Sequence, residues 1–254
     1  MSNWQDIGDV QIGTLASVGG EFVRIDGISE ASITLGRGCL DTAPRAHAAG
    51  TPIIFWDGGT TITTQTFAAG EEVAVRLLPQ TGRGTLAHAS APEDRTTFTR
   101  RAIRPLPPAR LQGNGSYDPP RDALIAAPLQ LTWAHRDRLT QTSPVIADYT
   151  APSIGPEPGV QYQVELRWVD PDTGQRAEAV GLIFDAGLAT SFALNPDDVP
   201  ESTAPERTAE IDITVRARRN VEGIWLTDRE SRHLRQTAPF AVGWDRSWGM
   251  FWGK

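Results

Sequence analysis

The chain has 254 residues, of which 39% are hydrophobic, and a net charge of −7 with a pI near 5.1. Its length suits one large domain or two ordinary ones, and its hydrophobic content supports globular cores rather than a disordered chain. Nucleic-acid affinity comes largely from clustered Lys and Arg, so the acidic balance argues against nucleic acid as a partner. Cys39 is the single cysteine, which excludes an intrachain disulfide and a cysteine-based metal cage.

The first ten residues, MSNWQDIGDV, have neither the basic start nor the apolar core of a secretory signal. No stretch approaches the roughly 18 consecutive apolar residues that a membrane span needs. We therefore expect a chain that is made in the cytoplasm and has no membrane span.

Residues 1–103 are predicted to form a small β-rich domain. Short runs rich in Val, Ile, Thr and aromatic residues alternate with glycine-containing turns, which is the pattern of an all-β unit. In the last run, Val73, Val75 and Leu77 would face one side of a sheet, with Glu72 and Arg76 on the other. The predicted strands cover residues 21–25, 32–35, 51–56, 60–66 and 71–78.

The segment RPLPPARLQGNGSYDPP, residues 104–120, is dense in Pro, Gly, Asn and Ser and has no hydrophobic period. Proline removes backbone donors and stiffens the chain towards polyproline II. We therefore predict a semi-rigid linker here and place the domain boundary at this segment.

Residues 121–239 have the strand spacing of a β-sandwich. About seven short strands over roughly 100 residues, with alternating apolar side chains and turn signals between them, are typical of that architecture. The predicted fold class is therefore all-β, with a small N-terminal β-domain followed by a sandwich. The side chains expected to face its core are Leu129, Leu131, Trp133, Tyr162, Val164, Leu166, Trp168, Ile211, Ile213, Val215 and Ala217.

Three features of this region resemble fibronectin type III domains. Trp133 on an early strand, Tyr162 on the next long strand and the run ITVRARRNVEGIW look like the B, C, F and G strands of that family. The resemblance covers about residues 128–234 and implies a sandwich of two antiparallel sheets. It departs from the family where a Tyr usually lies on strand F, because Ile211 or Ile213 takes that place, and in the long connection over residues 137–159.

The sequence contains no pattern typical of a catalytic or metal site. His135-Arg136-Asp137 matches the start of a kinase catalytic loop, but the Leu and the metal-binding Asn that should follow are missing. The four histidines have no second His or Cys at ligand spacing. Two groups of carboxylates, Asp170, Asp172 and Asp185, and Asp197, Asp198 and Glu201, lie in runs typical of solvated turns. We expect a non-enzymatic protein without a cofactor or metal.

The C-terminal tail, residues 240–254, is rich in large apolar side chains. Such a tail either folds back on its own domain or docks on another subunit, because an isolated segment cannot hide so much apolar surface. Aromatic residues of this kind are frequent interface anchors. The candidate interaction residues are Trp244, Trp248, Met250, Phe251 and Trp252.

Two runs resemble tail hub and tail tip proteins of long-tailed bacteriophages and gene transfer agents. The first, ITLGRGCLDTAPRAHAAGTPIIFW, has the R-G-x-x-D-T and H-A-A-G pattern found there, and the second comprises LTWAHRDRLTQT and PEPGVQYQVELRW, with Trp133 and Tyr162. In the first run a local Arg37–Asp41 pair is expected, and the small residues 48–50 would let another element pack close. The motif residues in the first run are Arg37, Gly38, Asp41, Thr42, His47, Ala48, Ala49 and Gly50.

The resemblance implies a structural component of a phage tail tip or baseplate, connecting the tail hub to distal fibres or receptor-binding proteins. In related proteins these modules end a much longer hub polypeptide, so we expect a separate subunit, made in the bacterial host and located in the virion tail. It would form a homotrimer, bind other tail proteins and contact the host surface. Two alternatives stay open: a tail module that recognises a host glycan or protein, and an accessory sandwich of a carbohydrate-active enzyme.

Overall fold

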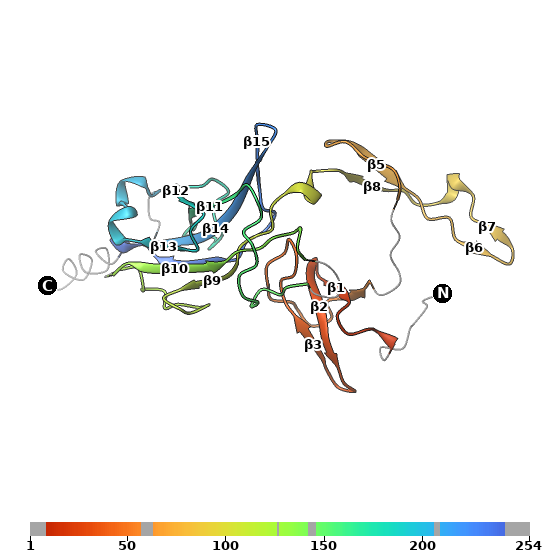
Figure 1. Ribbon diagram of the computed structural model, residues 1–254, viewed down its shortest axis with the longest axis horizontal. Helices are drawn as coiled ribbons and strands as arrows, with labels where there is room; N and C mark the ends of the chain where they lie inside the picture. Colours follow the sequence, from red (N-terminus) through yellow and green to blue (C-terminus); the bar gives the residue numbers. More distant parts are fainter. Residues whose placement is uncertain (1–8, 57–62, 126, 142–145, 206–208, 242–254) are drawn as a thin grey trace. The chain divides into compact units, whose positions relative to one another are not determined.

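A computed structural model describes residues 9–56, 63–125, 127–141, 146–205 and 209–241 (Figure 1). Strand makes up 39% of the structure and helix 7%, and the strands form several antiparallel sheets. The all-β prediction is confirmed. Helix in the described residues is limited to short 3-10 turns, and none has the length and apolar character of a membrane span.

The contacts within the chain divide it into two units. The first, here called the body, comprises Met1–Gly59 and Pro105–Lys254, and the second, called the arm, is Thr60–Arg104. The predicted N-terminal domain over residues 1–103 is therefore two pieces: its first half groups with the sandwich, and its second half forms a unit of its own.

The body begins with a four-stranded antiparallel sheet in the order β3-β2-β1-β4. Its core comes from alternate residues of the first hairpin, Ala16, Val18, Val23 and Ile25. Three of the predicted strands are found here, whereas β1 was not predicted. The strands are β1 (Leu15–Val18), β2 (Glu21–Ile28), β3 (Ile33–Gly36) and β4 (Ile53–Phe55).

The rest of the body is a sandwich of two sheets around one core. The first sheet has the order β13-β10-β9, with β9 (Ala109–Gly113), β10 (Leu129–Ala134) and β13 (Ser191–Leu194). The second has the order β12-β11-β14-β15, and β16 also pairs with β14. Its strands are β11 (Val160–Trp168), β12 (Leu182–Gly187), β14 (Glu210–Val221), β15 (Ile224–Thr227) and β16 (His233–Thr237).

The side chains predicted to face the sandwich core are all buried. The strand that carries Trp133 lies in the first sheet, and the strands proposed as C, F and G are neighbours in the second. The connections of the body include three short 3-10 turns, η4 (Pro196–Asp198), η5 (Glu201–Thr203) and η6 (Pro239–Ala241). Another 3-10 turn, η2 (His88–Ser90), lies in the arm.

The predicted linker over residues 104–120 is wrong. This segment contains β9, which pairs with β10, and Leu111 is fully buried in the sandwich core. Three of the five prolines in this segment precede the strand and two follow it, so none interrupts it, and β9 lies at the edge of its sheet, where proline-rich flanks are tolerated. A five-residue strand behind such a run has too little pattern to be recognised from the sequence.

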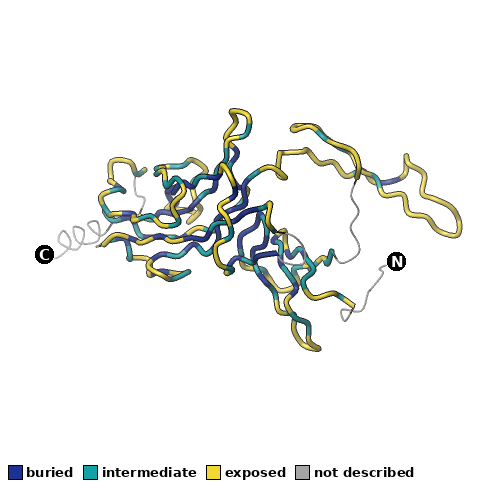
Figure 2. The backbone as a smooth tube through the Cα atoms, in the orientation of Figure 1, coloured by how far each residue is buried: buried dark blue, intermediate teal, exposed yellow. Residues whose placement is uncertain are grey.

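The arm consists of two-stranded ribbons. Strand β5 (Glu72–Val75) pairs with β8 (Asp94–Thr97), β6 (Gln80–Thr81) pairs with β7 (Gly84–Thr85), and η3 (Arg101–Ile103) ends the unit. The predicted apolar face is not a buried one, because Val75 is 48% and Leu77 is 76% exposed. Residues 63–66 form no strand, and the rest of the predicted strand at 60–66 lies outside the described residues. Figure 2 shows the exposure of the arm along almost its whole length.

Candidate functional site

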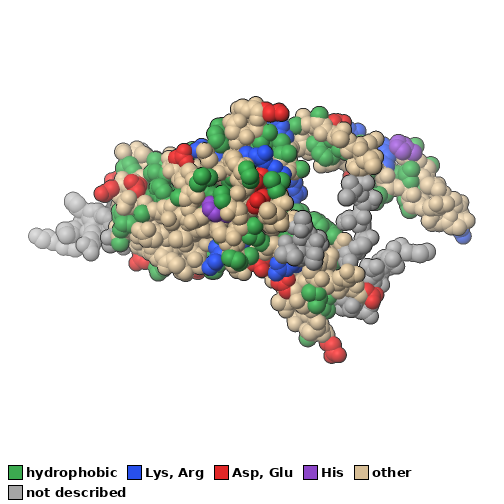
Figure 3. Space-filling view, viewed as in Figure 1, with side chains coloured by type: hydrophobic (Ala, Val, Ile, Leu, Met, Phe, Trp, Pro, Cys, Tyr) green, Lys and Arg blue, Asp and Glu red, His purple; other side chains and the backbone are tan. Residues whose placement is uncertain are grey.

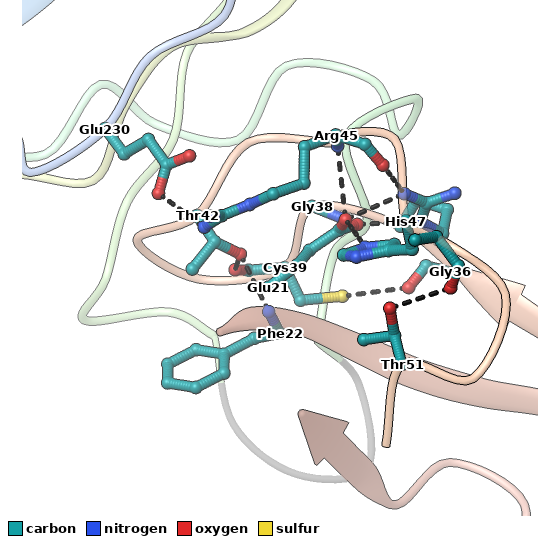
Figure 4. Close-up of polar contacts among 12 residues, drawn as sticks. Glu21, Phe22, Gly36, Gly38, Cys39, Thr42, Arg45, His47, Thr51 and Glu230 are labelled. Carbon is teal, nitrogen blue, oxygen red and sulfur yellow. Dashed lines mark hydrogen bonds and ion pairs between the residues drawn. The ribbon is translucent and has the colours of Figure 1, made fainter. Parts of the chain in front are cut away.

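Glu21 is the centre of the motif region, and its side chain is fully buried (Figure 4). It begins β2, where the strand alternation puts Glu21, Val23 and Ile25 on the inward face. A carboxylate in this position must be paired, because an unpaired buried charge is very costly.

Four groups bind the Glu21 carboxylate. Arg37 donates from Nε to Oε1 and from Nη2 to Oε2, both at 2.7 Å. The backbone N–H of Gly38 donates to Oε1 at 2.9 Å, and that of Arg45 to Oε2 at 3.2 Å. His47 Nε2 lies 2.8 Å from Oε2. Both carboxylate oxygens are therefore engaged.

The pKa of Glu21 reflects this cage. Burial alone would raise it, but the hydrogen bonds from Arg37, His47 and the backbone of Gly38 and Arg45 outweigh burial, and the pKa is lowered from its ordinary value. The carboxylate is thus held as an anion whose oxygens are already occupied, which suits a structural anchor rather than an acid or a base in a reaction.

Gly38 is required by the loop that surrounds Glu21. Its φ is +59°, and a Cβ placed there would lie 2.5 Å from Cδ of Pro44. Any side chain would therefore combine left-handed backbone strain with a collision against a proline ring. The glycine lets the backbone N–H of residue 38 reach the carboxylate.

Thr42 and Cys39 close the same loop onto the start of β2. Thr42 Oγ1 accepts from the N–H of Phe22 at 3.0 Å and donates to the carbonyl of Cys39 at 2.8 Å. The N–H of Cys39 donates to the carbonyl of Phe22 at 2.8 Å. Burial raises the pKa of the Cys39 thiol to about 12, so this cysteine is an inert core group.

Two expectations about the motif are wrong. Arg37 pairs with Glu21 rather than locally with Asp41, and Asp41 lies 3.9 Å from the guanidinium of Arg229. Residues 48–50 are exposed, and a Cβ at Gly50 would meet nothing within 4 Å, so no described element packs close there. The stretch forms a turn instead, in which Thr51 donates from its N–H and its hydroxyl to the carbonyl of Ala48.

The motif loop also joins the N-terminal sheet to the sandwich. The N–H of Tyr149 donates to the carbonyl of Arg37 at 2.7 Å, and the Tyr149 hydroxyl accepts from the N–H of Leu111 at 2.9 Å. Arg24 of β2 donates to the carbonyl of Ile146 and lies 3.3 Å from the carboxylate of Asp148. The long connection between β10 and β11 therefore serves as the joint between the two parts of the body.

Trp133 and Tyr162 lie together in the sandwich core. Their rings are 5.9 Å apart in an edge-to-face arrangement, and the Tyr162 hydroxyl lies 2.9 Å from Nδ1 of His135. Arg136 next to it donates to four backbone carbonyls, those of His135, Asp148, Ala151 and Pro152. The His-Arg-Asp sequence is thus a support for the joint, with its arginine engaged by the backbone.

The acidic residues were predicted to lie in solvated turns, and five of the six lie in turns or short 3-10 segments, whereas Asp185 lies within β12. Asp170 accepts from the N–H of Asp172 and Thr173, Asp185 pairs with Arg218 at 2.9 Å, and Asp198 accepts from Asn195 in a capping box. Within the described part of the chain, no group of three or more His, Cys, Asp or Glu side chains could hold a metal ion.

The predicted site residues therefore fall into three sets. Arg37, Gly38 and His47 meet around Glu21, while Thr42 braces their loop. Trp133 and Tyr162 form a separate core contact. The aromatic residues of the tail, Trp244, Trp248, Met250, Phe251 and Trp252, lie outside the described residues.

Glu21 and Arg24 were not singled out from the sequence. The signal in the sequence is the alternation of the strand: in the run EFVRI, Glu21 lies on the same face as Val23 and Ile25, two apolar residues that face the core. A charge in the inward phase of a strand predicts a buried ion pair, and the nearest arginine after a turn, Arg37, is its partner.

No protein-family profile matches the chain, and no curated protein matches its sequence.

Proposed function

We propose that the chain is a structural component of the tail tip or baseplate of a long-tailed phage or gene transfer agent. In this role it connects the tail hub to distal fibre or receptor-binding proteins through protein–protein interfaces. The observation that carries the proposal is the engagement of the tail-protein motif: Arg37, Gly38 and His47 bind the buried Glu21, and their loop is bonded to the sandwich.

The joint within the body supports a connector role. Hydrogen bonds and ion pairs run from β2 and the loop after β3 to residues 146–149, and Arg45 lies 3.0 Å from Glu230. Several contacts of this kind together resist relative movement of the two parts, which a component that transmits load requires. The motif side chains hold the fold together and take no part in chemistry in this proposal.

The proposed partners are other tail proteins, with the chain as a homotrimer in the virion tail. The tail over residues 240–254 would anchor it to a neighbouring subunit. Three-fold symmetry suits a closed assembly around a tail axis.

A second candidate function, recognition of the host surface, is favoured by one observation. Trp225, near the turn between β14 and β15, is 49% exposed, and the Arg218 guanidinium lies 4.9 Å from its ring centre. Arg218 also pairs with Asp185. An exposed aromatic ring among polar groups is suited to stacking against a sugar. Loss of host-cell binding in Trp225→Ala, with an unchanged unfolding midpoint, would support this function.

Gene disruption tests the proposed structural role. Particles made without the chain are expected to lack a complete tail tip in electron micrographs and to lose infectivity or transfer, and the wild-type gene supplied in trans should restore both. Normal tails from the disrupted strain would contradict the proposal.

A further inference from the structure

The arm exposes apolar side chains, and its described residues form no hydrophobic core of their own. Ala91 is the one buried residue between residues 63 and 104, and Phe67 and Phe98 stack at 4.5 Å on an otherwise open surface. Figure 3 shows hydrophobic side chains at the surface of this unit. Its exposed large hydrophobic residues are Val75, Leu77, Leu78, Leu86, Phe98 and Ile103.

Such a unit needs a partner surface. A lone two-stranded ribbon is at best marginally stable in water, and both edges of each ribbon in the arm are unpaired among the described residues. Open edges with apolar side chains are templates for pairing with another chain.

Charge indicates what the partner surface is. The arm contains six arginines and four carboxylates, a net charge of +2, which leaves a net charge of −9 for the remainder of a chain whose total is −7. A basic arm and an acidic body attract each other, and this complementarity favours a second copy of the same chain.

One segment of the body matches the arm in charge and in shape. Residues 177–205 contain five carboxylates and no Lys or Arg: Glu178, Asp185, Asp197, Asp198 and Glu201. The segment contains β12 and β13, and each of these strands lies at the edge of its sheet. It also exposes Ile183 and Leu188, at 58% and 63%.

We propose that the arm of one copy docks on the β12–β13 edge of a second copy. The β5–β8 ribbon would extend the sheet at β12, with apolar contacts from Leu77 to Ile183 and its surroundings, and the arm's arginines would face the acidic segment. Backbone pairing at an open edge supplies affinity, and the side chains supply specificity. The inference concerns the purified chain alone and does not depend on its place in a virion.

Cross-linking of mixed variants tests the contact. Leu77→Cys and Ile183→Cys are made in separate full-length chains, mixed and treated with a short bis-maleimide; the native Cys39 is buried and unreactive. We expect a covalent dimer containing one chain of each kind. The matched control replaces Ile183→Cys with Leu139→Cys, which is 61% exposed in the body, and should give no dimer. A missing mixed dimer, or one equally abundant in the control, would overturn the proposal.

Sedimentation of the full-length chain distinguishes self-association through the arm from binding of the arm to a different protein. Wild-type chain should self-associate, more weakly as salt is raised, and Leu77→Asp should raise the dissociation constant at least tenfold. Ile12→Asp, equally exposed but in the body, should leave it unchanged. A monomer at all concentrations, whose arm amides become protected from exchange only when another tail protein is added, would assign the arm to a different partner. Normal tails from a strain in which the gene is disrupted, with this association intact in the purified chain, would count against the proposed function alone.

Discussion

Arg37 and Glu21 form a two-point ion pair, with both nitrogen–oxygen distances at 2.7 Å, across sixteen residues of sequence. The pair fastens the end of β3 to the start of β2, and the backbone of Gly38 and Arg45 completes the cage. The motif residues therefore form a loop around one buried carboxylate. The carbonyl of Arg37 in this loop accepts a hydrogen bond from the N–H of Tyr149, which connects the loop to the sandwich.

Replacing Arg37 by lysine should destabilise the body. An ammonium group provides a single point of contact where the guanidinium makes two, so the Glu21 carboxylate loses one of its two hydrogen bonds from residue 37 while those from the backbone of Gly38 and Arg45 remain. We expect Arg37→Lys to lower the free energy of unfolding by about 1–3 kcal/mol in urea titrations. Arg83→Lys, on the exposed turn of the arm, is the control and should change it by less than about 0.5 kcal/mol.

The stability of the body should fall in acid because of Glu21. Its folded pKa is below the unfolded value, so its contribution is present above about pH 4.3 and is lost as the pH falls through the folded pKa. Unfolding of wild type and Glu21→Gln between pH 3 and 7 should show a difference that is constant above about pH 5 and shrinks below it. A difference that grows towards low pH would show that folding raises the pKa of Glu21 instead of lowering it.

Asp228 should change the pH dependence of stability in the opposite direction to Glu21. It is fully buried against Arg216, with 2.7 Å between Oδ1 and Nε, and burial raises the pKa of this carboxyl to about 6. The folded state therefore binds the proton more readily than the unfolded state, and its stability falls as the pH rises from about 4 to about 6. Relative to Asp228→Asn, wild type should lose on the order of 2 kcal/mol over this interval. An increase over the same interval would contradict the assignment.

Two glycines with positive φ allow strain and collision to be separated. Gly38→Ala introduces a Cβ 2.5 Å from Pro44, whereas Gly50→Ala introduces one into open space. Gly50→Ala should cost only the left-handed backbone penalty, about 1 kcal/mol. Gly38→Ala should lower the free energy of unfolding by at least about 1 kcal/mol more, because the proline ring must move. Equal costs in thermal or urea unfolding would show that the loop relaxes freely.

Removing residues 244–254 tests the aromatic anchor. The core described by the structure comes from residues up to Phe240, all of which are kept in this variant, so we expect the truncated chain to keep its unfolding midpoint. Its incorporation into particles, measured by quantitative mass spectrometry, should fall at least several-fold. Normal incorporation would show that the tail does not anchor the chain.

The sandwich was predictable because its two longest strands carry apolar residues at alternate positions, and Tyr162, Val164, Leu166 and Trp168 are all buried as expected. β9 was not recognised because it follows a run of three prolines. The arm was misjudged because Val73, Val75 and Leu77 alternate as in a buried strand, although no second layer of described residues covers them. The cage around Glu21 depends on contacts between residues 16 to 26 positions apart, and local patterns carry no record of such pairings. The one usable signal in the sequence was the position of Glu21 on the inward face of its strand, which indicates a buried ion pair.

The most direct measurement is cryo-electron microscopy of intact particles of the phage or gene transfer agent that, under the proposal, encodes the chain. The proposal predicts density at the tail tip into which the body fits in three symmetric copies, in contact with the hub on one side and with fibre or receptor-binding proteins on the other. Purified, fully assembled tails whose tip contains no density for the body, and whose peptides do not include this chain, would contradict it.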